Sequence, residues 1–418
     1  VAVTLVVGRG ASLRKETTVK AAWDQSHGSW DEFMARYPAR EANAAARTIE
    51  ALASDLGIDL AQASPGEMTQ SGGQCSLKPR VSVGRYLSQQ LERAATALEA
   101  PPEEIVEYFT EHDEQLEALR RALLNGETPL WRRDLSLLYD APVPNLVGQL
   151  NLHRALLAHA LVRLREGDHA TALADLEASW RLSASLDDNP ILINQLIAVT
   201  VTRIQIGTLR HMDSVPEAWV HRLETLDHRT AMLEALAFEN RQWLYVNLTA
   251  QELADDDGAP WILRVLGEAY WLFGVADGSE RWRRLMVDLA AIEHPCDPSA
   301  WTLVEGFRES VPSWNIPGRI LTPSVPRALA KVGRLELDIE LTRKILEIKN
   351  ARAPDGTWPQ SVQGIETSLC PDSRWIYSVT PLGVMTIELD HEIEWPRHTG
   401  SKLPNRYTAP PPDVGSRV

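Results

Sequence analysis

The stretch from residue 145 to residue 194 limits the fold more than any other part of the chain. Apolar residues recur at helical spacing from Leu150 to Leu164, and a Glu-Gly-Asp break at 166–168 precedes a second run with the same period. The second run ends at Pro190, because proline cannot continue a helix and disfavours it in the preceding residue. A third apolar helix is expected at 191–209. The pattern therefore predicts a helical hairpin with a third helix beside it.

Helical periodicity also dominates most of the remaining chain. Helices are expected at 23–37, 43–56, 81–98, 101–125, 216–226, 228–253, 261–273, 281–292 and 326–351, with a loop-rich connection at 294–326. Near the end, 374–379 and 384–389 alternate as strands around a Pro-Leu-Gly turn. We expect an all-α fold, an irregular helical array with a small C-terminal β-hairpin. Its expected parts are an N-terminal stub (1–22), a helical body (23–326), a long helix with the hairpin (327–395) and an extended tail (396–418).

Charge excludes one class of partner. The 418 residues carry a formal net charge of -15 with no basic stripe, whereas unaided binding to nucleic acid or an anionic membrane requires one. No nucleic-acid partner is expected. Residues 1–7, VAVTLVV, are apolar but too short for a bilayer, which takes about 20 residues. We interpret them as the stub of a trimmed signal or anchor, with a short strand or a disordered end as alternatives.

The three cysteines are too few for a disulfide framework, and no CxxC motif occurs. Cys296 and Cys370 both lie in proline turns and form the preferred pair if the compartment is oxidising. Three reduced thiols are the alternative.

Two segments resemble known structures. Residues 156–190, with LVRLREG, DHATALADL and the closing DDNP, resemble one tetratricopeptide unit, without a second copy at that period. The helix at 333–352, followed by GTWPQS and RWIYSV, resembles the C-terminal module of an uncharacterised family of bacterial envelope proteins, and YPAREANAAARTIEALASDLGIDL resembles that family's first helices. Such proteins have an N-terminal anchor, a helical body and a terminal hairpin similar to the closing strands of type II secretion pseudopilins. The resemblance implies an envelope location and brings no catalytic residues.

Acidic clusters are the candidates for metal binding. Asp187-Asp188 and the Asp-Asp-Asp run at 255–257 offer the carboxylate oxygens that Mg²⁺ prefers. Both lie at helix ends beside Pro or Gly, so the alternative is solvated turn acids. No HExxH or related histidine pair is present.

Polar residues on the central helices are the candidates for a binding site. If they converge they form a buried polar site or a peptide-binding groove; otherwise they form an interhelix hydrogen-bond network. The candidate binding residues are Asn145, Gln149, His153, Asn194, Gln195 and Arg203. The candidate catalytic residues are Glu239, Arg241 and Asp134. We expect Glu239 and Arg241 to be partly buried and paired.

These features favour a non-enzymatic helical scaffold in the bacterial envelope, periplasmic or secreted, that binds a protein or peptide partner without a cofactor. Contact with the membrane is expected only through an N-terminal anchor. The alternative is an all-helical lyase, cyclase or hydrolase that uses Asp/Glu acid–base groups, with Mg²⁺ at Asp187 and Asp188, and the alternative location is the cytoplasm. An enzyme is expected to show a deep pocket with converging acids, and a binding module a long groove.

Overall fold

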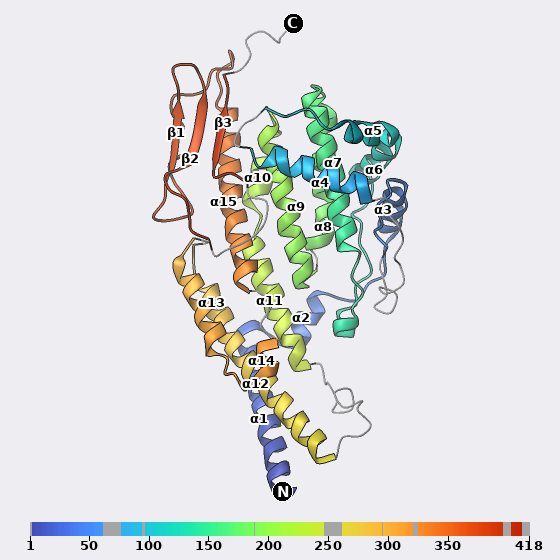
Figure 1. The fold of residues 1–418 in the computed structure, drawn as a ribbon, viewed down its shortest axis with the longest axis vertical. Helices are drawn as coiled ribbons and strands as arrows, with labels where there is room; N and C mark the ends of the chain where they lie inside the picture. Colours follow the sequence, from blue (N-terminus) through green and yellow to red (C-terminus); the bar gives the residue numbers. More distant parts are fainter. Residues whose placement is uncertain are drawn as a thin grey trace.

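A computed structural model describes residues 2–61, 77–93, 97–187, 189–245, 261–294, 296–320, 325–395 and 403–411. Helices dominate, and one small antiparallel sheet lies beside the last long helix (Figure 1). This confirms the expected all-α fold with a small C-terminal β element.

The predicted hairpin and its third helix form the centre of the molecule. They are α7 (Leu146–Arg165), α8 (His169–Asp187) and α9 (Leu192–His211), and each packs against the other two. Gly167 adopts a positive φ of 84° at the α7–α8 turn, a conformation that glycine tolerates best. Within the described ranges, α9 alone has the length and hydropathy of a membrane-crossing helix. Because α9 also packs on α11 (His228–Tyr245) and α15 (Val325–Asn350), a core role explains its apolar composition.

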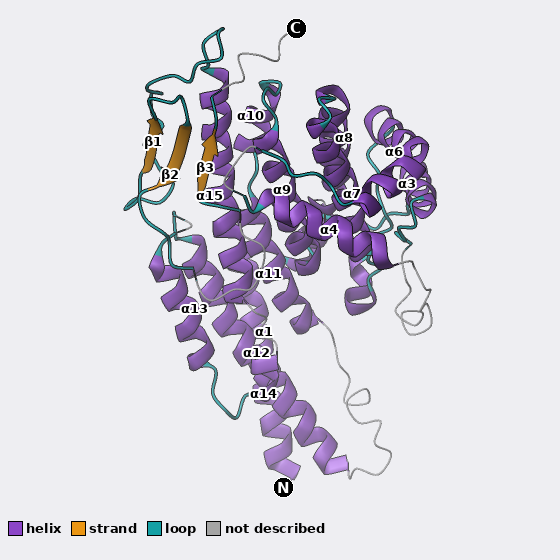
Figure 2. Ribbon diagram, turned by 45° about the horizontal axis from the view of Figure 1, so that its top comes forward, coloured by secondary structure: helices purple, strands orange, loops and turns teal. Residues whose placement is uncertain are grey.

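The N-terminal segment is helical rather than a strand or a disordered end. α1 (Ala2–His27) lies along α12 (Trp261–Ala290), and the two project from one end of the molecule (Figures 1 and 2). The single helix expected at 23–37 is wrong. Trp23 belongs to the end of α1, Gly28 has a φ of 77°, and α2 (Trp30–Arg36) begins after the Ser29 cap. The positive φ of Gly28 separates the two helices.

The two helices expected at 261–273 and 281–292 are one continuous helix, α12. Gly274 and Gly278 do not break it; they make room for the short helix α14 (Ile316–Ile320), since a Cβ on Gly278 would lie 2.6 Å from the Gly318 Cα. The segment 294–326, expected to be an irregular connection, contains two helices, α13 (Pro298–Ser310) and α14. Close helix packing explains why glycines occur within α12.

Gly278→Ala is therefore expected to destabilise the protein by about 1–3 kcal/mol, because the added methyl group meets backbone that cannot rotate away. Gly267→Ala in the same helix is the matched control. A Cβ there meets nothing within 4 Å, so the change is expected to stabilise the helix by about 0.5–1 kcal/mol. Urea unfolding of both variants measures the difference, and equal effects would contradict the packing role of Gly278.

The other helices complete the array. They are α3 (Ala44–Asp55), α4 (Leu77–Leu91), α5 (Glu103–Glu111), α6 (Asp113–Asn125), the 3-10 helix η1 (Leu135–Asp140) and α10 (Ala218–Glu224). The helix expected at 101–125 is two helices that meet at His112, whose φ of -114° departs from helical values.

The C-terminal sheet has three strands in the order β1 (Trp375–Val379), β2 (Met385–Leu389) and β3 (Arg406–Ala409). The first two form the predicted hairpin. The third comes from the segment expected to be an extended tail, and Tyr407 pairs with Ile387. The sheet lies beside α15 (Figure 2). Its buried side chains pack with those of α15 in a core of their own, separate from the main core. A disulfide joins Cys296 to Cys370, the preferred pair.

Candidate functional site: an acidic cleft beside α15

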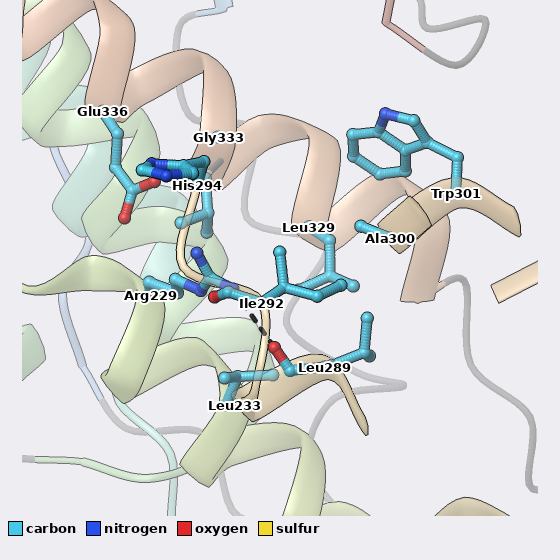
Figure 3. Close-up of a pocket in the computed structure, with 11 residues that line it drawn as sticks. Arg229, Leu233, Leu289, Ile292, His294, Ala300, Trp301, Leu329, Gly333 and Glu336 are labelled. Atoms are coloured by element: carbon cyan, nitrogen blue, oxygen red, sulfur yellow. Dashed lines mark hydrogen bonds between the residues drawn. The ribbon is translucent and has the colours of Figure 1, made fainter. Parts of the chain in front are cut away.

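Three adjoining hollows meet where α11 begins, α12 ends and α15 passes between them. Arg229, the second residue of α11, lines all three. Its guanidinium donates hydrogen bonds to the carbonyl oxygens of Leu289 and Ile292 at the end of α12, which Figure 3 shows in part. Arg229 thus fixes the end of α12 against the start of α11, and the hollows open around this junction.

The largest hollow, with a volume of about 680 Å³, is an acidic cleft between α10, the start of α11, α15 and the segment 363–369. Its lining carboxylates are those of Glu224, Asp227, Glu293, Glu336, Glu340 and Glu347. Its lining cations are Arg229, Arg343 and Lys344. Acids exceed bases, so the cleft has a negative balance suited to a cationic ligand.

Several of these charges already have partners. Arg343 pairs with Glu224 at 2.6 Å, and Glu340 accepts a hydrogen bond from the Leu369 N–H at 3.1 Å. These contacts hold the 363–369 segment and α10 against α15, and they set the width of the cleft.

Glu336 differs from its neighbours. It lies between the cleft and a small apolar hollow, and Figure 3 shows its carboxylate in the same region as the His294 ring and Arg229. Among the described residues that carboxylate forms no hydrogen bond or salt bridge, although Arg229 and His294 line the same hollow. Burial raises the pKa of Glu336 to about 7, and Arg229 only partly offsets the effect. A cation bound in the cleft would therefore stabilise the charged form of Glu336.

The raised pKa of Glu336 predicts a dependence of stability on pH. Between pH 4.5 and about 7 the folded state holds a proton that the unfolded state releases, so the free energy of unfolding falls as pH rises through this window. The loss from this group is at most about 3 kcal/mol. Glu336→Gln is expected to remove that part of the slope, measured by urea unfolding at pH 5 and pH 8. An unchanged slope in the variant would contradict the burial of this carboxylate.

The candidate binding residues on α7 serve the helix core. Asn145 caps α7 by accepting a hydrogen bond from the Gly148 N–H. His153 Nδ1 lies 2.9 Å from Ser179 Oγ, which also accepts from Gln205. Burial lowers the pKa of His153 to about 3, so its ring is neutral. Gln149 is buried as well.

The remaining binding candidates lie on α9 and are held by separate contacts. Gln195 donates to the Asn189 carbonyl at 2.8 Å, Asn194 is buried, and Arg203 lies 3.3 Å from the Asp338 carboxylate. None of the six candidate binding residues lines the hollows described above. Only some of these side chains join an interhelix network, because both polar atoms of the Gln149 side chain and Oδ1 of Asn194 are buried without a hydrogen-bond partner among the described residues. A role of the six residues in binding a partner stays a prediction.

Glu239 and Arg241 are buried or half-buried and hydrogen-bonded, as expected, but to different partners. Arg241 donates to the Asp24 carboxylate and the Gly28 carbonyl, both at 3.0 Å. Glu239 accepts from Gln242 and from the Leu192 N–H, and burial raises its pKa. Of this pair only Arg241 lines a hollow.

The other acidic candidates show no site in the described residues. Asp134 caps η1 by accepting from the Ser136 N–H. Asp187 ends α8, and its side chain, Asp188 and the acidic run at 255–257 lie outside the described residues. No cluster of three metal-ligating side chains occurs in the ranges that the structure covers, so Mg²⁺ at Asp187 and Asp188 stays a prediction.

One buried charged group was not anticipated. His159 Nδ1 lies 2.6 Å from Asp175, which also accepts from Arg120, while Arg163 donates to His159 Nε2 at 3.1 Å. Both ring nitrogens are therefore occupied, and the group links α6, α7 and α8. The signal in the sequence was Asp175 itself, a charged residue at helical spacing from the apolar residues Ala172 and Leu182 on α8.

Comparisons of the chain with protein-family models, curated proteins and solved structures find no match.

Proposed function

We propose that the chain is a binding scaffold whose acidic cleft takes a basic side chain from a protein or peptide partner. The observation that carries the proposal is Glu336, a half-buried carboxylate with a raised pKa at the wall of a 680 Å³ cleft. A bound ammonium or guanidinium group would supply the missing partner, and hydrogen bonds between charged groups are the stronger class. Glu293 and Glu347 extend the negative lining in the same cleft.

The location that we propose for this activity is the cell envelope or the extracellular medium. The Cys296–Cys370 disulfide supports it, because such bonds persist in oxidising compartments and are rare in the cytosol. Nothing in the proposal requires a cofactor.

The test is direct binding of a labelled, lysine-containing peptide, compared with the same peptide carrying norleucine in place of lysine. We expect the lysine peptide alone to bind, with affinity that falls as salt rises. Glu336→Gln is expected to weaken binding about tenfold, which corresponds to about 1.4 kcal/mol.

The matched control is Glu103→Gln, which removes an exposed carboxylate from α5, outside the cleft. It is expected to leave the affinity unchanged. Equal binding of the two peptides, or equal losses in the two variants, would reject the cleft as the recognition site.

A further inference from the structure

A second hollow adjoins the acidic cleft and has fewer carboxylates in its lining. Its volume is about 510 Å³, and it lies between α2, α11 and the end of α12. Phe33, Leu233, Phe238 and Met286 provide apolar walls. Polar and charged side chains make up the other half of the lining and include the carboxylates of Glu234 and Glu293. A hollow of this size that combines an apolar wall with converging polar groups can hold a small molecule.

We call this hollow the arginine pocket, because three arginines line it: Arg36, Arg229 and Arg241. Arg36 pairs with Glu234 at 2.5 Å, and Arg241 with Asp24 at 3.0 Å. The guanidinium of Arg229 contacts carbonyl oxygens, and the described residues place no carboxylate within 4 Å of it. The Nε atom of Arg241 is buried without a hydrogen-bond partner. Donors therefore remain for an anion.

The pKa of His27, which lines the pocket, is sensitive to the charges around it. Its pKa is lowered to about 4 by burial, and then by the positive charges of Arg241 on α11 and Arg283 on α12. Asp24 on α1 is near but is engaged by Arg241. The remaining positive charge outweighs this carboxylate at the imidazole ring.

We propose that the arginine pocket binds a small carboxylate with an apolar body, such as a medium-chain aliphatic acid. The carboxylate meets Arg229 and Arg241, and the chain packs against Phe33, Phe238 and Met286. This site is distinct from the acidic cleft, which would repel the same ligand, although Arg229 and Glu293 lie at the border of both.

Calorimetry with hexanoate, octanoate and decanoate tests the proposal. Affinity is expected to rise about fourfold per added methylene group as apolar area is buried, and decanol is expected to bind much more weakly than decanoate. In NMR titrations, bound decanoate is expected to raise the His27 pKa from about 4, because a negative charge opposes Arg241 and Arg283.

The blocking variant is Ala290→Trp. Ala290 is exposed at the end of α12 and lines the arginine pocket but not the acidic cleft. The indole is expected to abolish decanoate binding and to leave lysine-peptide binding intact. Ala291→Trp, one residue further along and outside the pocket lining, is the matched control. Equal binding of decanol and decanoate, an unchanged His27 pKa, or decanoate binding to Ala290→Trp at the wild-type affinity would overturn the proposal.

Discussion

Asp338→Ala is expected to lower the free energy of unfolding by about 3–5 kcal/mol, the cost of breaking a buried ion pair from one side. Asp338 is 3% exposed on α15, and its carboxylate lies 3.3 Å from Arg203 and 3.5 Å from Arg210, both on α9. Arg210 is itself 4% exposed. Removing the carboxylate leaves a buried guanidinium without its counter-charge.

Arg210, the buried partner of Asp338, also joins the sheet to the helical body. Arg210 donates to Thr342 on α15 and to the Pro404 carbonyl, while its own carbonyl accepts from Lys349 and from the Tyr407 hydroxyl on β3. We therefore expect the loss of Asp338 to weaken the packing of both α9 and the sheet against α15.

Urea unfolding measures the effect, and Asp338→Asn keeps the shape of the side chain while removing its charge. The surface control is Glu388→Ala on β2, which breaks an exposed pair with Arg406 and is expected to cost less than about 1 kcal/mol. A loss in Asp338→Ala no larger than that in Glu388→Ala would show that the buried charges do not support the junction.

The sequence predicted the fold class because helical periodicity is a local signal. The α7–α8 hairpin and the β1–β2 hairpin are each set by residues close together in the chain and by their turns. The predictions of helix and strand bounds fail where contacts between residues far apart in the sequence determine the local structure. The gap expected between helices at 261–273 and 281–292 contains Gly274 and Gly278, whose role in packing against α14 is not visible in the sequence. The four-residue strand β3 forms by pairing with the edge of β2.

The acidic cleft could not be predicted from the sequence, because its walls come from residues 223–229, 293, 336–347 and 363–369. One partial signal was present. Glu336, Glu340 and Glu347 recur at helical spacing and share a face of α15. Without the opposing elements, such a row is indistinguishable from a solvated surface. Arg241 was singled out correctly as a buried cation, but its pocket depends on α2, which packs beside α11 only in the folded chain.

Removing the disulfide is the second change with a large expected effect. The bond joins residues 74 apart in the sequence, and closing a loop of this length restricts the unfolded chain. Cys296→Ser combined with Cys370→Ser is expected to lower the free energy of unfolding by about 2–4 kcal/mol. Urea unfolding with and without reductant measures it: reductant should destabilise the wild-type protein and leave the double variant unchanged. Cys75→Ser, a change outside the described residues, is the control and should behave as wild type.

The same bond is expected to affect the acidic cleft more than the arginine pocket. Cys370 follows Leu369, whose N–H donates a hydrogen bond to Glu340 in the cleft. Cys296 lies two residues after His294, and His294 lines the small apolar hollow together with Glu336. The disulfide therefore ties together two segments that border Glu336. We expect the double variant to bind the lysine peptide more weakly while it binds decanoate as before. Equal losses for both ligands would show that the bond supports the whole body, and unchanged peptide affinity would show that the helices alone hold the cleft.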